Sequence, residues 1–220
     1  MLKKKYLAEF IGTFALVFCG TGAIIIDEQT HGAVTHVGIA ATFGLIVLAM
    51  IYTFGEISGA HFNPAVTIGF AVAKRIDVKQ LVPFVICQLT GAIAASLLLK
   101  FLFPENQNLG TTSPAGSSIQ SFILEFILTY FLMLVIIHVS QGSKEVGIIA
   151  GIAVGGTVGL EALFAGPICG ASMNPARSLA PALASGHIQS LWIYLLAPSM
   201  GAIAAAFTWR LMNIQPTSGN

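Results

Sequence analysis

The triplet Asn-Pro-Ala occurs twice in the chain, as Asn63, Pro64 and Ala65 and again as Asn174, Pro175 and Ala176. An asparagine side chain can accept hydrogen bonds from the free N–H groups at a helix start, and proline suits the first helical position because no donor is needed there. Each triplet therefore predicts the beginning of a helix. The apolar runs Pro64–Ala73 and Pro175–Ala184 correspond to about 15 Å of helix each. Such helices reach the middle of a membrane and no further.

Two short helices that enter from opposite faces would place their amino ends together near the middle of the protein. Aligned peptide dipoles give each end the equivalent of about +0.5 charge, which opposes the passage of cations and protons. The asparagine amides can bind a passing oxygen, and the Gly- and Ser-containing segments before the triplets suit extended backbone that exposes its carbonyls. The residues expected to line this path with carbonyls are Gly59, Ala60, His61, Phe62, Gly170, Ser172 and Met173. This chemistry favours small neutral molecules with hydroxyl or amide groups.

The elements that must position these groups are membrane-spanning helices. Hydrophobic residues make up 55% of the 220-residue chain and charged residues only 9%, whereas a soluble domain carries about 25% charged residues. A helix needs about 20 mostly apolar residues to cross the hydrocarbon core. Six stretches meet that length: Tyr6–Ile26, Val34–Phe54, Gln80–Phe103, Ile119–Ser140, Val146–Phe164 and Leu191–Met212. The sequence therefore predicts an all-α membrane protein with six spans and two half-helices.

The two halves of the chain resemble each other. The segment AEFIGTF around Glu9 aligns with LEFILTY around Glu125, and SGAHFNPAVTIG aligns with CGASMNPARSLA. We expect a single transmembrane channel domain over residues 1–220, with halves at about 1–103 and 119–212 and a polar, turn-rich linker at 104–118. Three spans in each half reverse the chain direction, so the second copy lies upside down relative to the first. Pores and transporters with a site at the membrane midplane use such an inverted repeat.

Glu9 and Glu125 occupy equivalent positions inside apolar helices. A carboxyl group there costs about 2.5–3.5 kcal/mol on insertion scales and usually faces a partner or a cavity. We expect both groups to be structural and buried, and to accept hydrogen bonds from the backbone before the triplets, because single carboxylates related by the repeat suit that role. A proton relay is the alternative.

The basic residues indicate the orientation of the chain. With a cytoplasmic amino terminus, most of them fall on the inner side, in agreement with the positive-inside rule. These inner residues are Lys3, Lys4, Lys5, Lys74, Arg75, Lys79, Lys144 and Arg210. We therefore expect a multi-pass protein of the cell membrane with both termini in the cytoplasm.

The composition also argues against other binding partners. A net charge of +1 offers no basic face for nucleic acid. The three cysteines lack the spacing of a metal or disulfide framework, and neither a metal nor a cofactor is expected.

The tandem triplets in six spans, with Arg177 directly after the second, resemble the aquaporin (major intrinsic protein) family over nearly the whole chain. This resemblance implies a right-handed bundle of six helices with two re-entrant half-helices, one pore per subunit and a homotetramer. It also implies a constriction on the outer side, at four positions that correspond here to Phe43, Ala162, Ala171 and Arg177. Strict water channels carry His at the second position. Alanine widens the aperture, so solutes larger than water are expected to pass, while Arg177 supplies donors and repels cations.

The string LFAGPICGASMNPARSLAPAL most closely resembles the nodulin-26-like branch of this family. That resemblance implies passage of water, glycerol, urea and uncharged metalloid hydroxides such as boric or arsenous acid. Ser178 stands where glycerol facilitators of the family usually carry Asp, and Ala182 also follows the water-channel pattern. The chain departs from its relatives at Glu56 and Glu161, whose effects on the pore stay open.

Four classes of function differ in the groups that they need at the membrane midplane. A passive channel, including a strict water channel, fits a midplane lined by Asn, Pro, Ala and carbonyls, whereas an ion-coupled transporter normally needs a carboxylate or His at its site. An enzyme is not expected, because no Ser-His, paired-carboxylate or HExxH arrangement accompanies these residues. A non-conducting scaffold is disfavoured because every pore position remains small or polar.

Overall fold

The computed structural model describes residues 2–140 and 148–212, and regular structure in that part of the chain is helical. The described helices are α1 (Leu2–Gln29), α2 (Thr35–Ser58), α3 (Pro64–Val72), α4 (Val78–Leu102), α5 (Ser118–Val139), α7 (Ala150–Cys169), α8 (Pro175–Ser185) and α9 (Leu191–Met212). By length and composition, α1, α2, α4, α5, α7 and α9 could each cross a membrane. The prediction of six spans and two short helices is therefore confirmed. Lys144 and the first residues of the predicted fifth span lie outside the described residues.

Helix α7 continues five residues beyond its predicted end at Phe164, through Pro167 to Cys169. A proline inside a helix leaves the carbonyl four residues earlier without its N–H partner. Here that carbonyl belongs to Leu163, and the imidazole Nε2 of His36 on α2 donates to it at 2.7 Å. The predicted boundary is wrong because a donor 127 residues away in sequence compensates for the proline.

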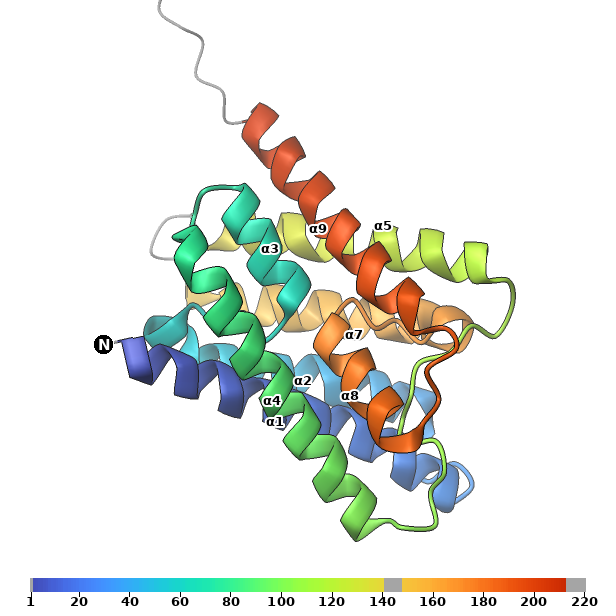
Figure 1. Ribbon diagram of the computed structural model, residues 1–220. Coiled ribbons are helices and arrows are strands. Elements are labelled where there is room, and N and C mark those ends of the chain that lie inside the picture. The colour runs from blue at the N-terminus through green and yellow to red at the C-terminus, as the bar shows by residue number, and fades with distance from the viewer. Residues whose placement is uncertain (1, 141–147, 213–220) are drawn as a thin grey trace, which may run out of the picture.

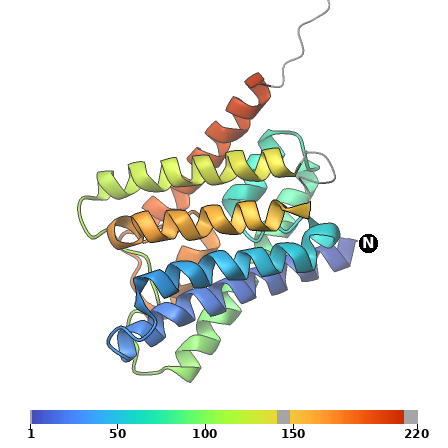
Figure 2. The same cartoon turned by 180° about the vertical axis from the view of Figure 1, so that it is seen from behind.

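The helices form two related halves that pack together (Figure 1). Helix α1 packs against α4 as α5 packs against α9, and α2 and α7 meet between the halves. Figure 2 shows α5, α7, α2 and α1 side by side in that order. Each short helix also reaches the other half, since α3 contacts α9 and α8 contacts α4. This exchange is what an inverted repeat requires if both half-helices are to meet in the centre.

One end of the bundle carries most of the described basic residues. Helices α1 and α4 begin there and α3 ends there, while a cation–π contact of 5.9 Å between Arg75 and Trp209 ties the end of α9 to the same place. We call this the basic end, and its residues are Lys3, Lys4, Lys5, Lys74, Arg75, Lys79 and Arg210. The segment that joins α4 to α5 lies at the opposite end.

Two glycines allow the paired helices to approach closely. A Cβ atom at Gly91 of α4 would collide with the carbonyl oxygen of Phe10 on α1, and a Cβ atom at Gly201 of α9 would collide with that of Phe126 on α5. The two contacts are equivalent in the repeat. Small residues at such crossings let helix backbones pack without intervening side chains.

We predict that Gly91→Ala destabilises the protein by about 1–3 kcal/mol, because the added methyl group forces α1 and α4 apart. Thermal unfolding in detergent measures this as a lower midpoint. Gly156→Ala is the matched control, since nothing lies within 4 Å of a Cβ atom at that helical position. Equal midpoints for the two variants would contradict the close packing described.

Candidate functional site

Both short helices begin at the asparagine of a triplet. Asn63 has extended backbone angles and its Oδ1 accepts from the N–H of Ala65 at 2.9 Å, while Pro64 takes the first helical position. Asn174 repeats this arrangement, with its Oδ1 accepting from Ala176 at 3.0 Å and from Arg177 at 3.4 Å. The side-chain oxygen of each asparagine therefore serves its own helix and leaves the amide nitrogen for other contacts.

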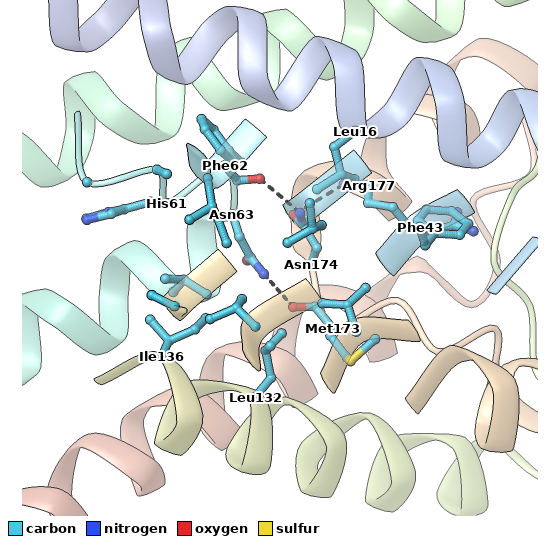
Figure 3. A pocket seen from close by; sticks show the side chains of 18 of the residues that line it. Leu16, Phe43, His61, Phe62, Asn63, Leu132, Ile136, Met173, Asn174 and Arg177 are labelled. Atoms are coloured by element: carbon cyan, nitrogen blue, oxygen red, sulfur yellow. Dashed lines mark hydrogen bonds between the residues drawn. The ribbon is translucent and has the colours of Figure 1, made fainter. Parts of the chain in front are cut away.

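The two amide nitrogens bind across the centre of the molecule (Figure 3). Nδ2 of Asn63 donates to the carbonyl of Met173 at 2.7 Å, and Nδ2 of Asn174 donates to the carbonyl of Phe62 at 2.9 Å. The amino ends of α3 and α8 therefore meet. A primary amide carries two N–H groups, so each asparagine keeps one for another partner.

The loops before the two asparagines share an unusual backbone. In each loop the residues four, three and one before the asparagine have positive φ angles. They are Gly59, Ala60 and Phe62 in the first loop and Gly170, Ala171 and Met173 in the second. Left-handed geometry costs a residue with a Cβ atom about 1–2 kcal/mol, so this conformation needs strong compensating contacts.

Glu9 supplies those contacts to the first loop. Its Oε1 accepts from the Ser58 hydroxyl at 2.6 Å and the His61 N–H at 3.0 Å. Its Oε2 accepts from the Phe62 N–H at 2.8 Å and from the Gln88 amide at 2.7 Å. Glu9 is completely buried, and its contacts satisfy backbone donors that water cannot reach.

Glu125 has the equivalent position in the second half. Its two oxygens accept from the N–H groups of Ser172 at 2.7 Å and Met173 at 2.8 Å. These loop positions correspond to His61 and Phe62 in the first half. Both carboxylates thus hold the same two N–H groups of their loops.

A cavity of about 110 Å³ runs beside the asparagines. Since a water molecule needs roughly 10–15 Å³ of space for its centre, the cavity has room for several waters. Part of the lining is apolar and includes Leu16, Leu132, Ile136, Val154 and Val158. The rest includes the two asparagines and the loop residues Gly59, Ala60, His61, Phe62, Ser172 and Met173. Among the described residues, no Asp, Glu or Lys lines this cavity.

The four positions expected to form the constriction, Phe43, Ala162, Ala171 and Arg177, line this same cavity. The Nη1 group of Arg177 donates to the carbonyl of Gly110 at 2.8 Å, and its guanidinium carbon lies 4.9 Å from the centre of the Phe43 ring. Figure 3 shows the two side chains next to each other, beyond Asn174. Arg177 is 2% exposed, so its charge acts inside the protein.

Several residues of interest do not line the cavity. Gly170 and the Pro and Ala residues of both triplets lie behind the lining. Glu56 is exposed on α2. Glu161 is buried with no partner for its Oε2 atom in the part of the chain described, and it also lies off the cavity.

Two parts of the site were not predicted from the sequence. The first is the face of α7 formed by residues 150, 154 and 158, which lines the cavity at helical spacing together with the predicted Ala162 and could have been found from that period. The second is Gly110, which holds Arg177 from an irregular segment. No local pattern predicts such a contact.

A family model described as "MIP: Major intrinsic protein" matches residues 1–209. The chain is 45% identical to Nodulin-26 from Glycine max, over 95% of this chain and 78% of that one. It is 44% identical to Aquaporin NIP1-1 from Oryza sativa subsp. japonica, over 95% and 74%. The X-ray structure of the aquaglyceroporin from Plasmodium falciparum superposes with a TM-score of 0.83 at 27% identity, and covers 95% of this chain and 96% of that chain.

Six potential spans, an inverted repeat and a lined central cavity define a multi-pass membrane channel. The chain belongs to the major intrinsic protein family, in which its relatives are aquaporin channels of the nodulin-26-like type.

We predict that Glu9→Gln lowers stability by about 1–3 kcal/mol, because one of its oxygens becomes an NH₂ group that faces hydrogen-bond donors. Thermal unfolding in detergent, followed by osmotic shrinkage of reconstituted vesicles, measures the effect on fold and on water flux. Glu56→Gln is the control, since that carboxylate is exposed. The prediction fails if both variants unfold at the wild-type temperature.

Proposed function

We propose that the protein is a passive channel that conducts water and small uncharged solutes, namely glycerol, urea and metalloid hydroxides such as boric and arsenous acid, and excludes ions and protons. The observation that carries this proposal is one cavity lined by both asparagines and by Phe43, Ala162, Ala171 and Arg177. The lining combines hydrogen-bonding groups with hydrocarbon side chains. A solute with hydroxyl groups can exchange its water for these polar groups while its carbon atoms contact the apolar side chains.

The electrostatics of this cavity support a neutral substrate. The amino ends of α3 and α8 meet beside it, each with the equivalent of about +0.5 charge, and Arg177 adds a full charge near one end. An ion-coupled transporter is the weaker candidate, because the lining in the described chain contains no carboxylate that could bind a coupling cation.

The small side chains at the constriction support solutes larger than water. Ala162 and Ala171 line the same cavity as the Phe43 and Arg177 pair, and each contributes only a methyl group to it. A strict water channel is the alternative, and it would need this opening to be closed to a three-carbon polyol.

The proposed setting is the cell membrane, with the basic end and both termini in the cytoplasm and four copies forming a homotetramer. The basic residues support the orientation. Large apolar side chains exposed along the spans, such as Leu45, Phe101, Ile127 and Leu160, suit contact with lipid or with neighbouring copies. One channel domain formed by both halves of the repeat supports one pore per copy.

Stopped-flow light scattering on proteoliposomes tests the proposed function. We expect water, glycerol, urea and boric acid each to cross faster than in protein-free vesicles, with rates that do not depend on proton or sodium gradients. Water flux alone would show a strict water channel, and gradient-dependent flux would show a coupled transporter.

We predict that Ala162→His reduces glycerol and urea permeability by at least tenfold and leaves water permeability within about twofold. An imidazole fills the opening across from Phe43 while offering water a polar group. Water flux measured in the same vesicles controls for protein amount. Equal loss of water and glycerol flux would contradict the placement of Ala162 at the constriction.

A further inference from the structure

Each asparagine is accompanied by a set of polar side chains at matching positions in its half. The residue two before the asparagine and the residue four after it contact each other in both halves. In the first half, Nδ1 of His61 lies 3.1 Å from Oγ1 of Thr67. In the second half, the hydroxyls of Ser172 and Ser178 lie 2.5 Å apart. All four side chains are buried.

The third member of the first set comes from a membrane-spanning helix. The Gln88 amide on α4 donates to Oγ1 of Thr67 at 2.9 Å and to Glu9 at 2.7 Å. Thr67 in turn donates to the carbonyl of Asn63 at 2.9 Å. The carboxylate that holds the first loop therefore also fixes the start of its half-helix.

Helix α9 has no amide side chain equivalent to that of Gln88 for the second half. Gly91 and Gly201 make equivalent contacts with α1 and α5, so the position three residues earlier is Gln88 in α4 and Pro198 in α9. The third member of the second set is instead Thr112, from the segment that joins α4 and α5.

The three hydroxyls of the second set form a directional chain. The carbonyl of Asn174 can only accept, so Ser172 donates to it at 2.9 Å. Ser178 must then donate to Ser172, and Thr112 donates to Ser178 at 2.8 Å. Each hydroxyl has one proton, and all three protons are used. These hydrogen bonds connect the segment between α4 and α5 to the backbone carbonyl of Asn174.

We propose that Thr112 is a positioning residue, which acts through Ser178 and Ser172 to fix Asn174 and thereby sets the selectivity of the channel. The inference rests on the proposed function and deepens it. The same segment holds Arg177 through the carbonyl of Gly110. The linking segment outside the spans thus positions both the second asparagine and the arginine, whereas the first asparagine is positioned by Glu9 and Gln88.

Loss of these hydrogen bonds between the three hydroxyls is expected to slow a polyol more than water. Glycerol carries its hydroxyls on a carbon frame and must match several fixed groups at once, whereas a water molecule reorients freely. Thr112→Val removes the hydroxyl but keeps the shape of the side chain. We expect glycerol permeability to fall about fivefold, equivalent to about 1 kcal/mol at 1.4 kcal/mol per tenfold, and water permeability to change less than twofold.

Two matched variants control the flux experiment. Thr112→Ser keeps the hydroxyl and is expected to restore the glycerol-to-water ratio. Thr111→Val removes a neighbouring hydroxyl that bonds to the Asn108 carbonyl and Ser185, and is expected to leave the ratio unchanged. If Thr112→Val does not reach the membrane, Thr112→Ala takes its place. A wild-type ratio in the hydroxyl-free variant overturns the inference.

A double-mutant cycle identifies the route. If Thr112 acts through Ser178, then Thr112→Val causes no further change in a Ser178→Ala background. Independent effects that multiply would overturn the proposed chain.

A spectroscopic measurement separates this inference from the proposed function. With ¹⁵N-labelled asparagine, Thr112→Val is expected to shift the side-chain resonance of Asn174, assigned by its loss in Asn174→Asp, and to leave that of Asn63 in place. An unmoved Asn174 resonance overturns the inference even in a channel that conducts. Absence of flux in the wild-type protein overturns the proposed function alone.

Discussion

Two buried carboxylates, Glu9 and Glu125, hold the loops on which the central site depends. Each loop combines left-handed residues with N–H groups that lie far from water, and each carboxylate accepts from the two N–H groups just before the asparagine. These hydrogen bonds satisfy backbone donors that water cannot reach, which offsets the cost of the left-handed geometry. Only with the loops held this way do Asn63 and Asn174 reach the opposite carbonyls.

The position of Glu125 also fits a cavity without acidic lining. Glu125 does not line the cavity, and its oxygens already accept from the N–H groups of Ser172 and Met173. This carboxyl group is therefore not offered to a solute. A lining that, in the described chain, has no cation-binding carboxylate is what a channel for neutral molecules needs.

The sequence was sufficient wherever a structure follows from local chemistry. Asn-Pro starts, apolar length and the repeated Glu position predict α3, α8, the six spans and the equivalence of the halves. Contacts made across the fold were not predictable. Helix α7 passes Pro167 because His36 serves the freed carbonyl, and Arg177 is held by Gly110 in an irregular segment. The local sequence around a proline or in a polar linker is the same whether or not a distant residue bonds to it, so it does not predict such a contact.

The two asparagines of the inverted repeat have the same geometry, but different side chains form the hydrogen bonds that position them. Glu9 receives the amide of Gln88, and that amide also bonds the hydroxyl behind Asn63, so the first half is fixed by side chains of the spans alone. Pro198 in α9 cannot supply an equivalent donor, and a hydroxyl from outside the spans takes that role. Because the linking segment contacts the groups around the second asparagine, a change in that segment acts on the second half of the site.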